Sequence, residues 1–368
     1  MTTDTAAAPA LKDLIDTAAL RALADVFADA SPGFQHKRFL AVATDGLDAL
    51  SIMQRVHRIA EALGAALPGG FADQLDAVCA AAPRASGAFI NMGLCDFVAT
   101  HGLHDADASL RALKRLTPHG TAEFAIRPFL RQDLPGTLKT MERWTTDRSE
   151  HVRRLASEGC RTRLPWSFRL DALVADPAPL APILRALRAD DSLYVRRSVA
   201  NSLNDVTKDH PDWVFDHIAD WDLTDPRGAW IVKHALRNRI KQGDTRALKL
   251  IGASDGARAT IARLSVHPPR VAIGGEIEIA FDLRSTADAD QRLVVDYVVH
   301  YVKKNGSASP KVFKLKTVEL AAGDSAAIRI RRALRNFTTR THYAGTHRVE
   351  VLVNGQRLAD GAFELLEA

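Results

Sequence analysis

The sequence predicts a mainly α-helical repeat solenoid followed by a C-terminal all-β sandwich. The first observation is a repeat: Ser149-Glu-His-Val-Arg-Arg-Leu-Ala returns as Ser192-Leu-Tyr-Val-Arg-Arg-Ser-Val, with a weaker third copy at Val232-Lys-His-Ala-Leu-Arg. The second is a change after Gly256 from helical spacing to alternating, β-branched runs. A period of roughly 40 residues with a helix-forming composition is typical of stacked helix pairs such as HEAT repeats.

These patterns divide the chain into three regions. Residues 1–10 predict a flexible N-terminus, because they are small and polar and show no apolar periodicity. Residues 11–256 predict the HEAT-like solenoid, since apolar residues recur there at the spacing of a helix face. Residues 257–368 hold seven short alternating runs separated by turn pairs such as Asn354-Gly355. That number of strands in so short a segment predicts an immunoglobulin-like sandwich.

Composition excludes several classes of protein. The three cysteines of the 368-residue chain are far apart and form no CxxC pair, which argues against a zinc site and against a disulfide framework. The first residues lack the basic and apolar regions of a signal peptide. No apolar run approaches the roughly 20 residues that a membrane span needs. We therefore expect a cytoplasmic protein that needs no metal and no membrane.

The distribution of charge predicts a polyanionic partner. The formal net charge is +5, and the run from Arg143 to Arg169 places seven arginines against three acids. In the C-terminal region the most basic run includes Arg331 and Arg332, which we interpret as candidate phosphate contacts. Clusters of this kind on a modestly basic protein indicate nucleic acid. The alternative, that these arginines form solvated surfaces, stays open.

Helical pitch sorts the repeat residues into columns. In the first copy Arg154, Glu158 and Arg161 share a face at i, i+4 and i+7. The corresponding positions in the later copies are Arg197, Asn201 and Asn204, with Asp205 beside them, and Lys241 in the third. Corresponding faces of a solenoid line one surface, so we expect a basic trough with acids set into it. An ion pair between Arg154 and Glu158 that only stabilises the helix is the alternative.

Two further residues are open to both a structural and a functional interpretation. Thr121 is a candidate N-cap that would place Glu123 in the first turn of a helix, where spacing alone favours pairing with the helix dipole. Pro128 is unfavourable inside a helix, so this helix is either kinked or begins near Arg127. Trp166 follows a proline and either seals one repeat against the next or offers an exposed ring for stacking.

Several segments together resemble one known family. They look like the AlkC branch of the AlkC/AlkD DNA alkylation-repair proteins over about residues 10–255, and the C-terminal region resembles the immunoglobulin-like domain of one AlkC subset. The segments that carry the resemblance are Ala122-Glu-Phe-Ala-Ile-Arg-Pro-Phe129, Val152-Arg-Arg-Leu-Ala-Ser-Glu-Gly159, Arg163-Leu-Pro-Trp166 and Tyr194-Val-Arg-Arg-Ser-Val-Ala-Asn-Ser-Leu-Asn-Asp205.

The resemblance implies a monofunctional DNA glycosylase of base excision repair. Such an enzyme removes cationic N-alkylated bases, chiefly N3-methyladenine with N3-methylcytosine as a further candidate, from duplex DNA, and it does so as a monomer without metal or cofactor. A base that already carries positive charge has a weakened glycosidic bond, so carboxylates suffice to stabilise the cationic sugar and orient a water. A non-catalytic scaffold that binds DNA or protein is the rival interpretation.

The same resemblance implies roles for individual residues. Glu123, Glu158 and Asp205 are the expected carboxylates at the lesion, and Trp166 is the expected aromatic wall. The expected DNA contacts in the repeats are Arg153, Arg154, Arg161, Arg196, Arg197, Asn201, Asn204 and Lys241. The acids discriminate between the enzyme and the scaffold, because a scaffold that binds phosphates has no use for carboxylates in its groove.

Overall fold

The computed structural model describes residues 10–254, 256–336 and 341–367. The chain divides into two compact units, Met1–Ile231 and Val232–Ala368, which are described separately. Within the described ranges, no helix has the length and apolar character that crossing a membrane requires.

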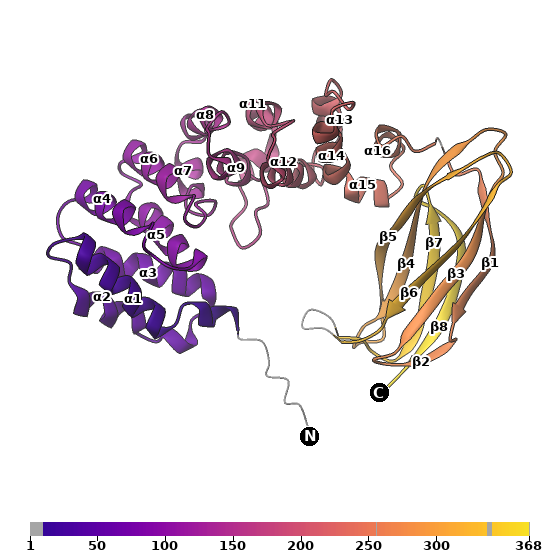
Figure 1. Ribbon diagram of the computed structural model, residues 1–368, viewed down its shortest axis with the longest axis horizontal. Helices are drawn as coiled ribbons and strands as arrows, with labels where there is room; N and C mark the ends of the chain where they lie inside the picture. Colours follow the sequence, from indigo (N-terminus) through magenta and orange to yellow (C-terminus); the bar gives the residue numbers. More distant parts are fainter. Residues whose placement is uncertain (1–9, 255, 337–340, 368) are drawn as a thin grey trace. The chain divides into compact units, whose positions relative to one another are not determined.

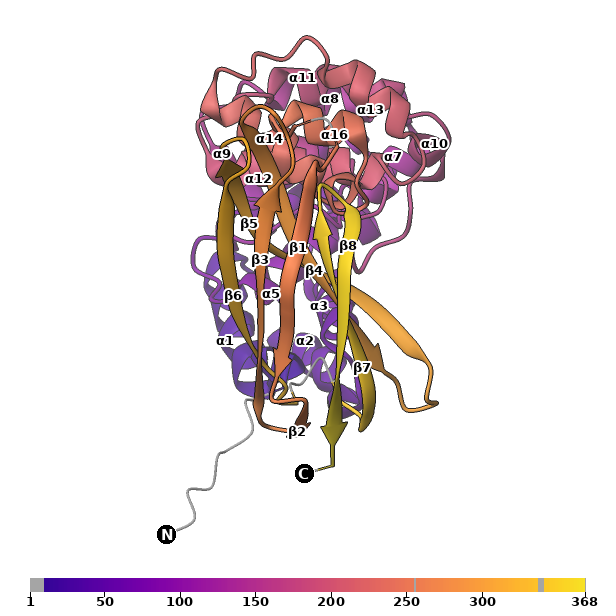
Figure 2. The same ribbon diagram turned by 90° about the vertical axis from the view of Figure 1, so that its right-hand side faces the viewer.

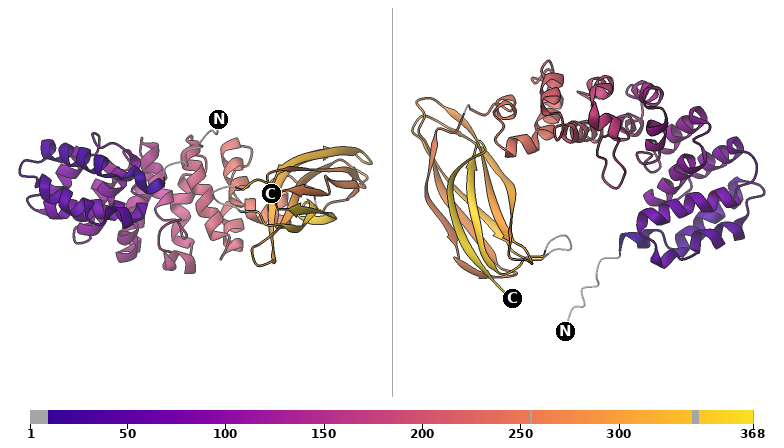
Figure 3. Two further views of the ribbon diagram at one scale, coloured as in Figure 1. Left: turned by 90° about the horizontal axis from the view of Figure 1, so that it is seen from below. Right: turned by 180° about the vertical axis from the view of Figure 1, so that it is seen from behind.

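The first unit is a solenoid of paired helices. Figure 1 shows α4, α6, α8, α11 and α13 in one row and α5, α7, α9 and α12 in another, and the rear view in Figure 3 agrees. The predicted mainly helical repeat class is confirmed for this unit. The bounds are α1 (Thr17–Ala30), α2 (His36–Thr44), α3 (Ile52–Ala66), α4 (Phe71–Ala81), α5 (Ala88–His101), α6 (Ala106–Leu116), α7 (Arg127–Gln132), α8 (Leu134–Trp144), α9 (Glu150–Glu158), α10 (Asp171–Ala175), α11 (Ala181–Ala186), α12 (Leu193–Val206) and α13 (Pro211–Ile218). Short 3-10 turns occur at Leu11–Leu14, Leu47–Ala49 and Ala178–Leu180.

The sequence repeat corresponds to a structural repeat. The first two copies form α9 and α12, which pack against each other. The valine of each copy, Val152 and Val195, is buried, as its place on the apolar face of the helix requires. At the contact the hydroxyls of Ser157 and Ser198 lie 2.7 Å apart. The two copies of the repeat therefore lie side by side in the solenoid.

The second unit is a sandwich of two sheets with helices attached. The helix α14 (Pro226–Ala235) crosses from the first unit, and α15 (Arg237–Lys241) and α16 (Thr245–Leu250) follow. One sheet has the order β1-β3-β6 and the other β2-β8-β7-β4-β5 (Figure 2). The strands are β1 (Ala259–His267), β2 (Arg270–Ala272), β3 (Glu276–Ser285), β4 (Gln291–Val302), β5 (Ala308–Leu320), β6 (Ser325–Ala333), β7 (Gly345–Val353) and β8 (Gln356–Leu366).

Alternation of side chains builds the sandwich core. Ile279 and Phe281 of β3 face Val295 and Tyr297 of β4, and all four are buried. The predicted immunoglobulin-like class is confirmed, with one strand more than the seven expected. The additional strand, β2, pairs in parallel with β8 and has three residues, too few to produce a recognisable alternation.

The helices α15 and α16 belong to the same compact unit as the sandwich. Asn354, in the turn between β7 and β8, donates from Nδ2 to the carbonyls of Ser254 (3.0 Å) and Gly256 (2.9 Å). In the same region the backbones of Gly243 and Gly355 approach so closely that a side chain on either would overlap the other. The division between the compact units thus falls after Ile231, whereas the change of sequence pattern predicts a boundary after residue 256.

We expect Gly355→Ala to destabilise the second unit strongly. A Cβ at Gly355 would lie 2.1 Å from Gly243 Cα, and the backbone φ of +77° already disfavours a side chain. We expect a loss of at least about 3 kcal/mol of unfolding free energy, since both backbone strain and an overlap with main chain contribute. Gly306→Ala is the control, because φ is also +77° there and nothing lies within 4 Å. Urea unfolding that gave equal losses for the two variants would contradict the close approach.

Candidate active site

Glu123 lies in a turn rather than in a helix. The helix α7 begins at Arg127 with Pro128 near its start, so the second of the two alternatives for this segment is correct. The expectation that Glu123 occupies a first helical turn is wrong, because Pro128 is tolerated only at the N-terminus of a helix and moves the start beyond Glu123. Thr121 Oγ1 donates to Glu123 Oε2 at 3.0 Å, and Arg154 Nη2 lies 2.5 Å from the same oxygen.

The three expected carboxylates alternate with two arginines in one continuous series of ion pairs. Arg154 connects Glu123 to Glu158, whose Oε1 is 3.7 Å from Arg154 Nη2. Arg161 then connects Glu158 (Nη1 to Oε1, 2.6 Å) to Asp205 (Nε to Oδ2, 2.9 Å). The relative exposures of Glu123, Glu158 and Asp205 are 9 %, 5 % and 4 %. Acids buried to this degree need partners, and the arginines supply them.

Arg161 is the cation at the centre of this series. Burial alone would lower the pKa of its guanidinium, but the neighbouring Glu158 and Asp205 raise that pKa above its ordinary value. Arg161 therefore remains charged and holds the two acids at fixed positions. The i, i+3 contact of Arg161 is shorter than the i, i+4 contact of Arg154, so the simple helix pair considered from the sequence is not the main contact of Glu158.

A pocket of about 320 Å³ opens beside the acids. Glu123, Glu158 and Arg161 contribute its polar wall. Its other lining residues are Phe89, Met92, Thr121, Phe124, Leu164, Pro165 and Trp166. Asp205 is not one of the lining residues and contacts the pocket through Arg161. The pocket therefore combines carboxylates with aromatic and aliphatic surface, an arrangement suited to a flat group that carries positive charge.

Trp166 is held outward by an unusual backbone. The residue is 65 % exposed, and its φ is +66°, in the left-handed region that residues other than glycine rarely adopt. Of the two roles considered from the sequence, the exposed ring agrees with this placement and the seal between repeats does not. Strain of this kind persists where the surroundings enforce it, and it concentrates at functional sites.

The backbone of Trp166 leads to a stability prediction. Trp166→Gly and Trp166→Ala both remove an exposed ring, so little burial is lost in either. We expect the glycine variant to be the more stable by about 1 kcal/mol, because only glycine adopts the positive φ without strain. Guanidinium unfolding of the two variants measures the difference. An alanine variant as stable as the glycine variant would show that the loop is not held at this φ.

Arg127, which our sequence analysis did not select, holds the loop that carries Trp166. Its side chain is fully buried, and its guanidinium donates to the carbonyls of Gly159 (2.9 Å), Arg161 (2.8 Å) and Phe168 (2.5 Å). Burial lowers the pKa of Arg127 to about 10, so the group is still a cation at neutral pH. The available signal was an arginine between apolar neighbours at the start of a helix, where a charge is costly unless it is paired.

Arg153 and Arg196, expected as DNA contacts, lie between the repeats. Arg153 binds both carboxylate oxygens of Asp190 (2.7 and 3.0 Å) and the carbonyl of Asp147, in the loop before its own helix. Arg196 donates to the carbonyls of Asp190 and Asp191 in the same way. These contacts favour a structural role over phosphate binding. A helix directs the two adjacent arginines of each copy about 100° apart, so the first arginine of each copy does not share a face with the second.

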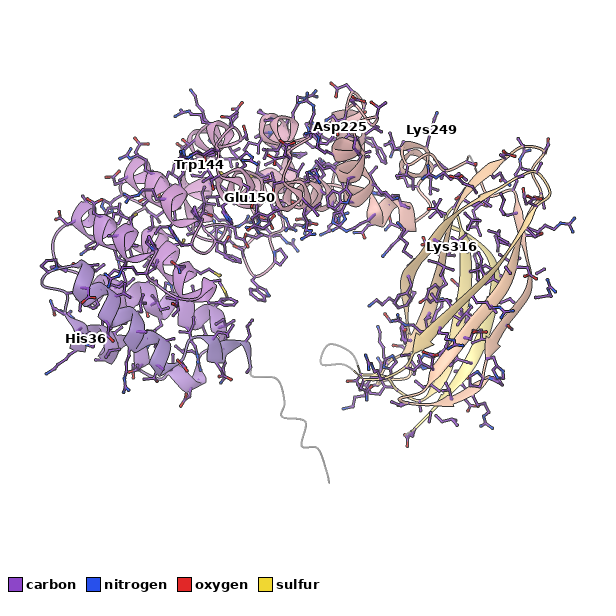
Figure 4. The ribbon with its side chains drawn as sticks, in the orientation of Figure 1. His36, Trp144, Glu150, Asp225, Lys249 and Lys316 are labelled. Carbon is purple, nitrogen blue, oxygen red and sulfur yellow. The ribbon has the colours of Figure 1, made fainter. Side chains whose placement is uncertain are left out.

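The N-terminal ends of α9 and α12 also contact each other. Glu150, the first residue of α9 (labelled in Figure 4), accepts a hydrogen bond from Ser192, the residue before α12. Among the other expected contacts, Arg197 is exposed, Asn201 is half-buried and Asn204 is buried at 3 % exposure. Among these three residues, Arg197 is thus the one whose side chain is most open to solvent.

The remaining expected DNA contacts lie in the second unit. Neighbouring residues of a strand face opposite sides, so Arg331 and Arg332 do not form one patch. Arg331 is exposed with its Nε 3.5 Å from Glu278, whereas the guanidinium of Arg332 lies 4.0 Å above the ring of Phe313. Lys241 lines a small cavity of about 60 Å³ together with the buried Asp296.

The described residues contain no group of three or more histidine, cysteine, aspartate or glutamate side chains that could hold a metal ion. The fold and the site together define a helical-repeat protein with buried acids in an aromatic pocket and a C-terminal immunoglobulin-like sandwich. A family model described as DNA alkylation repair enzyme matches residues 117–251. A second model, described as the C-terminal immunoglobulin-like domain of the uncharacterised protein YhaZ, matches residues 260–367.

Relatives match nearly the whole chain. The uncharacterized protein YhaZ of Bacillus subtilis (strain 168) is 36 % identical over 326 residues, which cover 88 % of this chain and 90 % of the relative. The solved structure of Pseudomonas fluorescens alkylpurine DNA glycosylase AlkC, bound to DNA containing an abasic site analog, is 49 % identical with a TM-score of 0.93. That match covers 97 % of this chain and 100 % of the other. The chain belongs to the AlkC family of alkylpurine DNA glycosylases, as the resemblance of its motifs predicted.

Proposed function

We propose that this protein removes cationic N-alkylated bases, chiefly N3-methyladenine and secondarily N3-methylcytosine, from duplex DNA by hydrolysis of the N-glycosidic bond. The observation that carries the proposal is the pocket in which Glu123 and Glu158 lie beside the exposed ring of Trp166. A relative of 49 % identity that is an alkylpurine DNA glycosylase bound to DNA supports the same reaction.

The acids suit a reaction in which charge develops on the sugar. The alkylated base already carries a positive charge, so the bond from C1′ to the base nitrogen breaks with both electrons moving to the base, which leaves neutral. The sugar becomes an oxocarbenium-like cation, which the buried carboxylates of Glu123 and Glu158 stabilise electrostatically. A water oxygen then bonds to C1′ and gives its proton to a carboxylate.

We assign the water to Glu158 Oε2. Both arginine contacts of this carboxylate use Oε1, with Arg161 Nη1 at 2.6 Å and Arg154 Nη2 at 3.7 Å. The second oxygen is therefore the one oriented for another donor. Asp205 acts through Arg161, which it binds from the side away from Glu158, so we assign Asp205 to positioning. The ring of Trp166 would contact the cationic base or the sugar.

We further propose that Arg197 binds a DNA phosphate. It is exposed on α12, on the same helix as Asp205 but without the interior contacts that occupy Arg196. A phosphate contact of this kind contributes to affinity and to its dependence on salt, with little effect on the choice of base. Arg154 and Arg161 are assigned to the acids instead, because their guanidinium groups already bind carboxylates.

The test is base release by the purified full-length protein. Duplex DNA treated with a methylating agent is incubated with the protein in the presence of EDTA, and the released bases are separated and identified by mass. We expect N3-methyladenine as the main product, together with abasic sites that alkali converts into strand breaks. Salt-sensitive binding to the duplex without base release or strand breaks would overturn the proposal and leave a non-catalytic DNA-binding protein.

A further inference from the structure

We propose that Tyr194 is a positioning residue of this active site, acting through Arg154 on Glu123 and Glu158. The inference rests on the proposed glycosylase function. Tyr194 is the second residue of α12 and is 37 % exposed. The guanidinium carbon of Arg154 lies 4.7 Å from the centroid of the tyrosine ring, within the range of a cation–π contact.

Arg154 needs a support of this kind because its contacts with the acids use one edge of the guanidinium. Nη2 binds Glu123 at 2.5 Å and lies 3.7 Å from Glu158, while Nη1 donates to Thr121 at 3.3 Å. With one contact through Nη1 and others through Nη2, the plane of the group can still tilt about the line that joins these two nitrogens. An aromatic ring against the flat face fixes that plane. Tyr194 therefore sets the direction in which Arg154 presents its donors.

The sequence repeat explains how the ring reaches this place. Tyr194 occupies the position in the second copy that His151 occupies in the first, one residue before the buried valine. Because α9 and α12 pack side by side, the two rings meet edge to face with centroids 5.7 Å apart. Arg154 is one turn after His151 on α9 and so lies over the tyrosine. The side chains of His151 and Arg154, both on α9, thus contact the tyrosine ring.

The ring also stays in the form that attracts a cation. Burial raises the pKa of the Tyr194 hydroxyl, an effect that the nearby Arg154 partly opposes. The phenol is therefore neutral at physiological pH and supplies its ring face rather than a negative charge. Without the ring, Arg154 could turn towards solvent or a phosphate. Glu123 would then lose its cation, and Glu158 would keep its contact with Arg161 but lose the one that connects it to Glu123.

The test compares four replacements of Tyr194 with the wild type in the full-length protein. Single-turnover excision of N3-methyladenine gives the rate of the chemical step, and a separate titration gives the dissociation constant for DNA. We expect Tyr194→Leu to lower the rate about tenfold, the upper part of the range for a partly buried cation–π contact, with the dissociation constant changed less than about twofold. Tyr194→Phe keeps the ring and should stay within about twofold of the wild-type rate. Replacement by difluorinated and then by trifluorinated phenylalanine should lower the rate progressively below that of Tyr194→Phe.

Specific results overturn the inference. A leucine variant as fast as the wild type would remove any role for the ring. Fluorinated rings as fast as phenylalanine would show that shape alone matters, and a phenylalanine variant as slow as leucine would assign the effect to the hydroxyl.

A double-mutant cycle shows whether the effect passes through Arg154. In an Arg154→Gln background we expect Tyr194→Leu to have almost no further effect on the rate, because the cation is already absent. Effects that multiply independently would contradict the proposed path. Failure of the proposed function is recognised separately, since the wild-type protein would then release no base before any variant is compared. The cycle repeated on urea stability reports the contact itself in either case.

Discussion

Glu158→Gln is expected to lower the single-turnover rate of base release by at least about 100-fold while leaving DNA affinity within about twofold. The amide has the shape of the carboxylate but carries no negative charge, so it neither stabilises the cationic sugar nor accepts the proton of the water. The amide oxygen would still accept a hydrogen bond from Arg161, whose Nη1 lies 2.6 Å from Oε1 of Glu158. The loss should therefore appear in the rate rather than in folding.

A matched control lies on the same helix. Glu150→Gln removes a carboxylate from the first turn of α9, at the opposite end of the helix from Glu158 and beside Ser192. We expect this variant to keep the wild-type rate. Asp205→Asn should be impaired less than Glu158→Gln, because Asp205 binds Arg161 and we propose that it acts only through that residue. Wild-type rates for both Glu158→Gln and Asp205→Asn would remove the carboxylates from the mechanism.

Arg127→Met is expected to cost at least about 3 kcal/mol of unfolding free energy. Methionine fills part of the space, but the carbonyls of Gly159, Arg161 and Phe168 lose their donor, and each buried acceptor left unsatisfied costs about 1 kcal/mol or more. Because these residues flank Trp166, activity should fall together with stability. Equilibrium unfolding in urea measures the first quantity, and base release at a temperature well below the transition measures the second.

Arg131→Met is the control for this prediction. Arg131 stacks on the ring of Phe168, whose carbonyl Arg127 binds, with its guanidinium carbon 3.6 Å from the ring centroid, but Arg131 is exposed to solvent. We expect a loss of about 0.5–1 kcal/mol, as for an exposed cation–π contact. If Arg127→Met were no more destabilising than Arg131→Met, the buried arginine would not be the support of the loop.

Much of the site could be predicted from the sequence because its signals are local. The Val-Arg-Arg copies identify α9 and α12, and the pitch of a helix directs Arg154, Glu158 and Arg161 to one side. The prediction that these residues share one face of the helix agrees with the ion pairs that connect them. The catalytic and DNA-binding roles themselves stay proposals until the variants are measured.

Other features depended on contacts between distant segments. Arg153 and Arg154 are adjacent and chemically identical, yet Arg153 binds a loop carboxylate, Asp190, while Arg154 binds Glu123. Helical pitch separates the directions of the two side chains but does not reveal their carboxylate partners, which come from distant segments. The same holds for Arg127, whose three acceptors lie more than thirty positions along the chain. Pairing across such separations is decided by packing.

By itself, the sequence determined the two fold classes, the repeat, and the residues that a helix or strand directs to a common face, because periods of 3.6 and 2 are properties of a short stretch of backbone. Tertiary structure decided which of those residues meet. It places Arg161 between Glu158 and Asp205, holds Trp166 outward at a strained φ, and joins the last helices to the sandwich through Asn354. Each of these depends on close approach of segments far apart in the chain, which burial and hydrogen bonding select.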